Sequence, residues 1–211
     1  MMAVAGNSPI DISWVASRFP PTNSANYSST IPLGSPHPKR IIVVSTYENT
    51  SSASLPTMNI DGNAGTLIPG ANYRPNNDCL KMFSIPVPNG TSGLLTINWP
   101  TSTFASIGVH RLLNQRSLTP IQVNQSLNLA VLPANLNTQA GGCVIVVGAY
   151  LGTTPPGNIF SSIGFNIDWA FPGPSQYGFG GSFKTTIPES PRTISANGNG
   201  TRSLMMAISL R

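Results

Sequence analysis

Two histidines, His37 and His110, are the side chains of this chain best suited to acid and base chemistry near neutral pH. Catalysis by a Ser/His/Asp set needs a histidine held between a carboxylate that orients it and a nucleophile. His37 stands in "SPHPKR", where the flanking prolines indicate an exposed, extended loop with no acidic residue near in sequence. His110 alternates with Val109 and Arg111, so if the Val109 face is the core, His110 faces outward. We therefore expect His110 to lie on a sheet surface and neither histidine to be catalytic.

The acidic residues offer a second route to catalysis, because a glycosidase uses two carboxyl groups about 5 to 9.5 Å apart. No two of them have a spacing in sequence that pairs them, although distant strands can bring carboxylates into one cleft. We expect no enzyme, and a glycan-cleaving enzyme is the least favoured function class. The six residues are Asp11, Glu48, Asp61, Asp78, Asp168 and Glu189.

Two short motifs resemble ligand-binding loops but fit other structures better. The stretch "IDGNAG", residues 60–65, begins like a calcium loop but lacks its further ligands, whereas Asp-Gly is typical of a tight hairpin turn. The stretch "GFGGSFKT", residues 178–185, matches a phosphate-binding loop except that Phe183 replaces the second glycine and no helix follows. We predict a hairpin turn and a glycine-rich surface loop, with no metal and no cofactor.

Charge is scarce in this chain of 211 residues. Charged residues make up 8% of it, and the net charge of +5 comes from cations that are scattered singly, apart from Lys39 and Arg40. A nucleic-acid backbone requires a basic stripe, so we expect no nucleic-acid partner.

The longest apolar run, which begins at Cys143, has about half of the roughly 18 to 20 residues of a membrane helix, so we expect no membrane insertion. The N-terminus lacks a secretory pattern, which predicts synthesis in the cytoplasm and favours buried free thiols for Cys79 and Cys143 over a disulfide.

Alternation of apolar and polar residues with a period of two dominates the sequence and predicts β-strands. The C-terminal "RSLMMAISLR" alternates in this way, so we expect the chain to end inside a sheet. The runs "RIIVVSTY" and "CVIVVGAYL" are rich in β-branched residues and typical of strands covered on both faces. In "SIGFNIDWAF" one face is predicted to carry Ile163, Phe165, Ile167, Trp169 and Phe171.

No segment sustains the periodicity of a helix, and many short strands are separated by Pro-, Gly-, Asn- and Ser-rich turns. The predicted fold class is all-β, an antiparallel, jelly-roll-like β-sandwich. We expect a single domain over residues 1–211, with an extended N-terminal segment over about residues 1–10.

The stretch "GLLTINWPTSTFASIGVHRLLN", residues 93–114, is predicted to form two antiparallel strands joined across Pro100. One face of both strands is expected to share a core, through Leu95, Ile97, Trp99, Ile107, Val109 and Leu113.

Three residues are candidate contacts to a glycan or to a neighbouring subunit: Trp99, His110 and Tyr177. Tyr73, Trp99 and Tyr177 carry rings that are able to stack on a sugar, and the last two lie near proline or glycine loops, although Trp99 also fits core or turn packing.

Read together, three stretches resemble a β-rich structural protein type of tailed phages and prophages. The first runs from "DISWVAS" through "SSTIPLGSPHPKRIIVVSTYEN" to "TMNIDGNAGTLI". The second is "FSIPVPNGTSGLLTINWPTSTFASIGVHRLLN", and the third combines "GGCVIVVGAYL" with the terminal "AISLR". Together they span nearly the whole chain, and the likeness is one of pattern.

The resemblance implies a non-enzymatic virion component, in the tail apparatus or as a capsid decoration or spike, with no catalytic residues. Such a protein is made in the bacterial host cytoplasm and located in the virion. A low-charge surface rich in Ser, Thr and Asn also suits permanent assembly contacts, so we expect a homo-oligomer, for example a trimer, bound to other virion proteins. A carbohydrate-binding module that recognises host surface glycans is the main alternative.

Overall fold

The computed structural model describes residues 8–20, 24–50, 52–129, 131–151, 159, 165–172, 176–197 and 203–211. Within these residues the chain consists of β-strands and their connections, and the pairings between the strands are all antiparallel. The predicted all-β, antiparallel class is confirmed, while the jelly-roll connectivity stays a prediction. The described part of the chain contains no helix with the length and apolarity needed to cross a membrane. The strands are β1 (Asp11–Arg18), β2 (Ser24–Pro32), β3 (Ile41–Asn49), β4 (Thr57–Ile60), β5 (Asn63–Ala64), β6 (Thr66–Tyr73), β7 (Asp78–Pro86), β8 (Ser92–Leu113), β9 (Gln122–Leu127), β10 (Val131–Thr138), β11 (Cys143–Leu151), β12 (Asn166–Pro172), β13 (Gln176–Lys184), β14 (Glu189–Asn197) and β15 (Ser203–Leu210).

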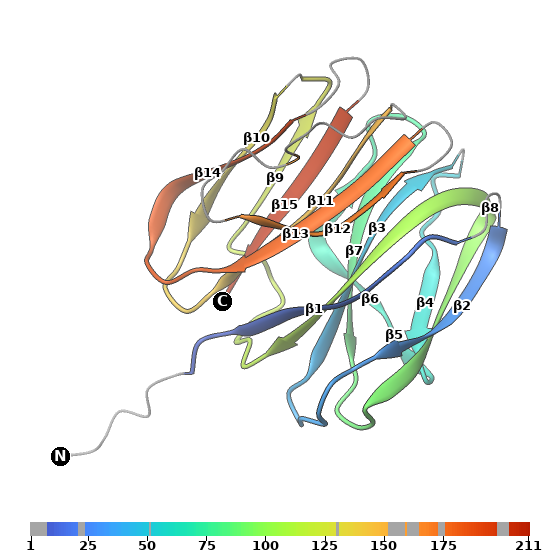
Figure 1. Cartoon of the computed structure of the whole chain (residues 1–211), viewed down its shortest axis with the longest axis horizontal. Coiled ribbons are helices and arrows are strands. Elements are labelled where there is room, and N and C mark those ends of the chain that lie inside the picture. The colour runs from blue at the N-terminus through green and yellow to red at the C-terminus, as the bar shows by residue number, and fades with distance from the viewer. Residues whose placement is uncertain are drawn as a thin grey trace.

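The strands form four stacked layers with three hydrophobic cores between them. The first layer contains β5, β4, β2 and the first half of β8, and the second contains β1, β3, β7, β6 and the second half of β8. The third layer has the order β12-β13-β11-β15-β9, and the fourth is the pair β10-β14. Figure 1 shows β1–β8 on one side and β9–β15 on the other, and the core between the second and third layers, here the central core, joins these two groups.

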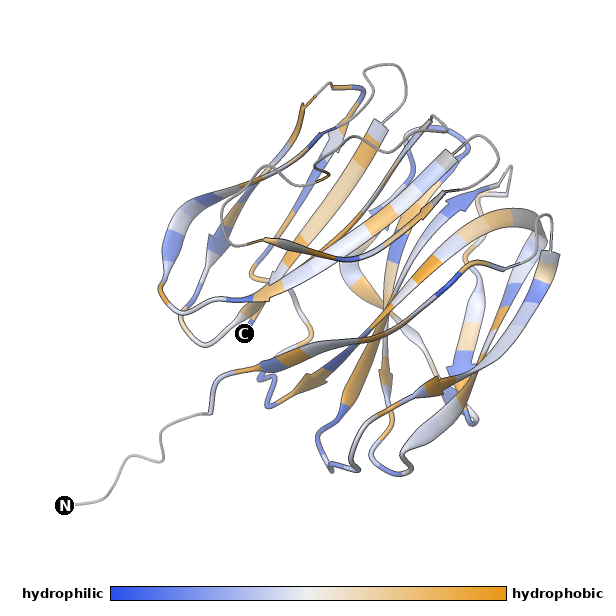
Figure 2. Cartoon of the chain, viewed as in Figure 1, coloured by the Kyte–Doolittle hydropathy of each residue, from blue (hydrophilic) through white to orange (hydrophobic). Residues whose placement is uncertain are grey.

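The middle strands of the second and third layers are buried on both faces. Along β3, Ile42 packs in the core between the first two layers and Val43 packs in the central core. Along β11, Ile145 lies in the central core and Val146 lies between the third and fourth layers. This confirms the prediction for the two β-branched runs, and Figure 2 shows apolar residues running along the strands. The last strand, β15, lies between β11 and β9, so the chain ends inside a sheet as predicted.

Strand β8 is one continuous strand of 22 residues, so the predicted hairpin across Pro100 is wrong. Its first half pairs with β4 as far as Asn98, and its second half pairs with β3 from Phe104 onward. Pro100 lies between these two ladders, where its missing N–H removes no bond to either strand. The shared core of the two halves was predicted correctly for Ile97 and Val109, which pack in the core between the first two layers.

The tight turn predicted at "IDGNAG" is present between β4 and β5. Asp61 and Gly62 have φ values of 48° and 82°, and Ile60 pairs with Asn63 across them. Two consecutive residues with positive φ are the signature of a type I′ hairpin turn.

The predicted extended N-terminal segment falls mostly on residues 1–7, outside the described residues. Within the remainder of that segment, Ile10 is buried and its N–H donates to the carbonyl oxygen of Gly141 at 2.7 Å.

Candidate functional site

His110 lies between the second and third layers and has no exposed surface. The alternation along β8 was predicted correctly, because Val109 packs between the first two layers while Leu112 packs in the central core on the opposite face. That opposite face is covered by the third layer. The prediction that His110 is a sheet-surface residue is therefore wrong, because alternation defines two faces but does not tell whether a second sheet covers them.

A bulge in β12 brings Asp168 to His110. The pairing of β12 with β13 shifts between Ile167 and Trp169, which leaves Asp168 as the extra residue of the bulge. Its Oδ2 lies 2.8 Å from Nε2 of His110, and the hydroxyl of Ser182 donates to the same oxygen at 2.6 Å. Nothing in the local sequence marks a bulge here, so neither Asp168 nor Ser182 was predicted as a partner of His110.

The bulge also corrects the single apolar face predicted for residues 163–171. Phe165 packs between the third and fourth layers, Trp169 packs in the central core, and Ile167 is exposed. Ile163 lies outside the described residues.

The chain Ser182–Asp168–His110 has the residue types of a catalytic triad in a different order. In a triad, the histidine lies between the serine and the carboxylate. Here the serine and the histidine both bond to the carboxylate, so the imidazole has no contact through which to activate the serine. A carboxylate accepts hydrogen bonds, which places the proton of a neutral His110 on Nε2, and Nδ1 has no partner among the described residues. The cluster fastens the second layer to the third.

Glycines allow the two layers to approach closely beside this cluster. A Cβ atom built on Gly108 of β8 would lie 1.9 Å from Nε1 of Trp169, and one built on Gly180 of β13 would lie 2.4 Å from the same atom. The stretch "GFGG" is thus part of a buried strand, and the surface loop predicted for residues 178–185 is wrong. The glycines serve close packing against an indole rather than a turn.

A buried ion pair lies on β3 and β7. Lys81 donates to Glu48 in an ion pair whose two side chains are 2% and 0% exposed, and the hydroxyl of Thr46 donates to the other carboxylate oxygen at 2.8 Å. These contacts satisfy both oxygens of a carboxylate that is removed from water.

The other carboxylates have structural partners of their own. Asp78 accepts from the hydroxyl of Tyr47 at 3.0 Å and Asp61 accepts from the N–H of Leu94 at 2.8 Å. The remaining pairs are Glu189 with Arg192 and Asp11 with Lys184, each at 2.6 Å.

Arg40 is a buried cation that binds two loops through their carbonyl oxygens. Its Nε donates to Val87 at 2.6 Å, and its terminal nitrogens donate to the carbonyl groups of both loops. Burial, and secondly the charge of Arg111, lowers the pKa of the Arg40 guanidinium. The loop carbonyls that it binds belong to Leu33, Gly34, Ser35, Val87, Asn89 and Gly90.

The three predicted contact residues are all buried in the chain. Trp99 is 5% exposed and belongs to the core between the first two layers, and His110 lies beneath the third layer. Tyr177 is 7% exposed and stacks on Tyr150 with ring centroids 5.1 Å apart. A glycan or a subunit contacts exposed side chains, so none of the three has the exposure that the predicted role requires.

Cys79 and Cys143 are free and buried, in agreement with the predicted thiols. Burial raises the pKa of Cys143 to about 12, and it also raises the pKa of Cys79. Both thiols are therefore in the neutral form, which is a poor nucleophile and a poor metal ligand. Among the described residues, no group of three His, Cys, Asp or Glu side chains is placed to hold a metal ion.

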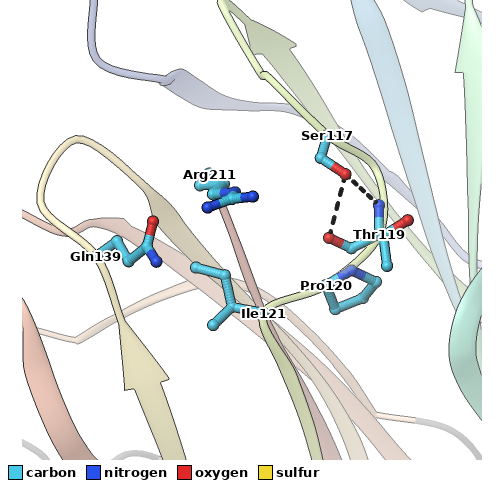
Figure 3. Close-up of a pocket in the computed structure, with 6 residues that line it drawn as sticks. All are labelled: Ser117, Thr119, Pro120, Ile121, Gln139 and Arg211. Carbon is cyan, nitrogen blue, oxygen red and sulfur yellow. Dashed lines mark hydrogen bonds between the residues drawn. The ribbon is translucent and has the colours of Figure 1, made fainter.

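A surface pocket of about 270 Å³ lies where the link between β8 and β9 meets the end of β15. Figure 3 shows Arg211 between Gln139 on one side and the turn formed by Ser117 and Thr119 on the other. The N–H of Thr119 donates to the hydroxyl of Ser117 at 3.0 Å, and the N–H of Ile121 donates to the carbonyl of Ser209 at 2.8 Å. This wall of the pocket is therefore tied to the third layer.

The described structure thus defines an all-β protein of stacked antiparallel sheets, with a buried ion pair and a buried His–Asp hydrogen bond between strands, and with a surface pocket beside the end of β15. Comparison of the chain with protein-family models, with curated proteins and with solved structures found no match.

Proposed function

We propose that the chain is a non-enzymatic structural protein of a bacteriophage virion, located on the particle exterior as a tail-associated protein or as a capsid decoration or spike. The sequence resemblance to virion proteins motivates the proposal. The idea that the chain assembles with copies of itself rests on one observation: two sheet edges are unpaired and expose large apolar side chains.

These edges belong to the second and third layers. Among the described strands, β1 pairs only with β8, and β12 pairs only with β13, so each has one unpaired side. Trp14 on β1 is 45% exposed and Ile167 on β12 is 44% exposed. An exposed edge with large apolar side chains is a template for association unless it is covered, and a symmetric copy is the most economical cover. The proposal therefore includes a homo-oligomer and contacts with other virion proteins.

The use of the buried polar groups supports a non-enzymatic role. The imidazole of His110 is held between two layers, and Lys81 is held by Glu48 inside a sheet core. A catalytic side chain has to reach its substrate, and these groups are sealed by the packing that they stabilise. The carbohydrate-binding alternative loses two of the stacking residues predicted for it, because Trp99 and Tyr177 are buried, whereas Tyr73 is partly exposed.

Mass spectrometry of phage particles tests the proposal. Particles would be induced from the bacterium that encodes the chain and purified by density gradient. The chain is expected in a fixed stoichiometry to the major capsid protein. Its absence from the particles, with the free protein present in the lysate, would remove the proposal.

Light scattering of the purified chain tests the assembly component separately. The expected mass is a multiple of 22.2 kDa, and Trp14→Ser with Ile167→Ser is expected to shift the mass toward one chain. Leu55→Ser is a matched control, because Leu55 is 40% exposed but lies in a loop between β3 and β4. A wild-type chain that stays monomeric at all concentrations would contradict this component.

A further inference from the structure

The antiparallel topology gathers cations that are scattered in the sequence at one end of the molecule. Lys39 precedes β3, Arg111 lies near the end of β8, and Arg116 follows in the link to β9. Lys184 ends β13, and Arg211 follows β15. We call these five residues the basic end. Figure 1 shows the C-terminus of β15 beside the start of β1 and the end of β8 at this end of the molecule.

Hydrogen bonds and ion pairs between these segments show that they meet. The N–H of Arg116 donates to the carbonyl oxygen of Arg211 at 2.8 Å, and the side chain of Gln115 donates to the carbonyl oxygen of Lys39 at 3.1 Å. Asp11 bridges the other two cations, with Lys184 at 2.6 Å and Arg111 at 3.7 Å.

Positive charge exceeds negative charge at the basic end. Asp11 and the backbone carboxylate of Arg211 lie within these contacts, against five cations, and Glu189 is paired with Arg192. Arg116 and Arg211 are exposed, and neither side chain has an ion-pair or hydrogen-bond partner among the described residues. Two unpaired guanidinium groups on a chain with 8% charged residues are a concentrated positive field.

The pocket at Arg211 gives the basic end a concave surface in which a ligand can be held. It places a guanidinium beside the hydroxyls of Ser117 and Thr119 and the amide of Gln139, over the apolar surface of Pro120 and Ile121 (Figure 3). Its volume of about 270 Å³ lies just below the range of roughly 300–1,000 Å³ for drug-sized ligands. One sugar residue with an acidic group matches this size and polarity.

A second pocket, of about 350 Å³, lies on the other side of the β10–β11 turn and includes Lys184 with Thr185 and Thr186. The same turn provides Gln139 to the first pocket and Gly141 to the second. Lys184 in the second pocket is paired with Asp11, and the Thr185 hydroxyl donates to the carbonyl oxygen of Gln139, so the unpaired charge lies at Arg211 and Arg116. A surface that continues from the first pocket into a second one favours a polymer over a single small ligand.

We propose that the basic end binds an anionic polysaccharide, with Arg211 and Arg116 pairing with its acidic groups. A guanidinium binds a carboxylate, sulfate or phosphate through two parallel hydrogen bonds, which gives both affinity and orientation. The described lining of both pockets contains no aromatic side chain. Proteins that bind single-stranded nucleic acid also stack its bases on aromatic rings, so this lining favours a polymer that is bound through its acidic groups and hydroxyls alone, as an anionic polysaccharide is. This proposal does not depend on the virion proposal, since purified chain is able to bind a polysaccharide whether or not it enters a particle.

Binding of the full chain to immobilised polygalacturonate and dextran sulfate tests the proposal, with uncharged dextran and single-stranded DNA as comparisons. The expected result is binding to one or both acidic polysaccharides at about 20 mM salt and much weaker binding at about 300 mM, because salt screens exposed charges. Preference between the two polymers distinguishes carboxylate from sulfate as the acidic group.

The double variant Arg116→Gln/Arg211→Gln is expected to bind about tenfold more weakly, which corresponds to the loss of one charge-assisted contact. The control is Arg18→Gln/Arg74→Gln, which removes the same charge away from the basic end, because Arg18 is the last residue of β1 and Arg74 follows β6. This variant is expected to change the affinity less than about twofold. If the control variant lost as much affinity, binding would depend on the net charge of the chain, and the basic end would not be the binding site. Absence of binding to both acidic polysaccharides, or tighter binding to DNA, would overturn the proposal.

Discussion

His110 of the second layer and Asp168 of the third are joined by a hydrogen bond of 2.8 Å between Nε2 and Oδ2, although 58 residues separate them in the chain. The bond crosses the central core and adds a directional polar contact to the apolar packing between the two sheets. Ser182 bonds the same oxygen from the neighbouring strand and so fixes the orientation of the carboxylate. The histidine is therefore a structural fastener between layers.

Replacing His110 with Ala should lower the free energy of unfolding by about 2–4 kcal/mol, because the change leaves a cavity and removes a partner of a partly buried carboxylate. Urea denaturation followed by fluorescence measures the loss. His37→Ala is the control, because His37 lies in a loop and should change stability by less than about 0.5 kcal/mol. Equal stability of the wild-type chain and the His110 variant would refute the fastener role.

Replacing Lys81 with Met should be more damaging than replacing Lys81 and Glu48 together. The single change leaves Glu48 buried and unpaired, which typically costs about 3–5 kcal/mol, whereas an apolar pair of similar size is often tolerated. Denaturation of Lys81→Met, Glu48→Leu and the double variant measures the coupling between the two residues. Strictly additive losses would show that the pair is not coupled.

Replacing Arg40 with Lys should loosen two loops at once, although the charge is kept. A lysine ammonium has three donors on one atom and cannot reach the carbonyl groups that the flat guanidinium bonds on both loops. Hydrogen exchange should become faster in residues 33–35 and 87–90. Lys39→Arg, next in sequence but exposed, is the control. Unchanged protection of both loops in Arg40→Lys would contradict the assignment.

The Cys143 thiol should make stability fall as the pH rises above 9. Its pKa is raised from 9.0 to about 12 in the folded chain, so the folded state holds this proton where the unfolded state has lost it. The contribution to stability is complete below pH 9 and is lost between pH 9 and about 12. In this window the wild-type chain should lose about 1 kcal/mol per pH unit more than Cys143→Ala does. Parallel pH profiles of the two proteins would disprove the effect.

The sequence contained most of the information on individual strands. The runs at Ile41 and Cys143 are apolar on both faces because β3 and β11 are covered from both sides, and this was readable from composition. The Asp61-Gly62 turn was also readable, because few residues adopt two successive positive φ angles. These features depend on local chemistry.

The arrangement of the layers could not be predicted from local sequence patterns. Pro100 was predicted to lie in a turn because proline lacks the N–H that a paired strand needs. Strand β8 continues through it because the pairing with β4 ends before Pro100 and the pairing with β3 begins after it. His110 looked exposed because its partner strand in the covering sheet, β12, begins more than 50 residues later in the chain. Long-range pairing and the bulge at Asp168 decide the site, and neither leaves a local pattern.

Cryo-electron microscopy of purified phage particles would show whether the chain is a structural virion protein. We expect repeated density on the particle exterior that fits the four β-layers, with the edge strands β1 and β12 against a neighbouring subunit. Particles whose complete exterior is explained by other proteins, with no density that fits this chain, would contradict a role as a structural virion protein.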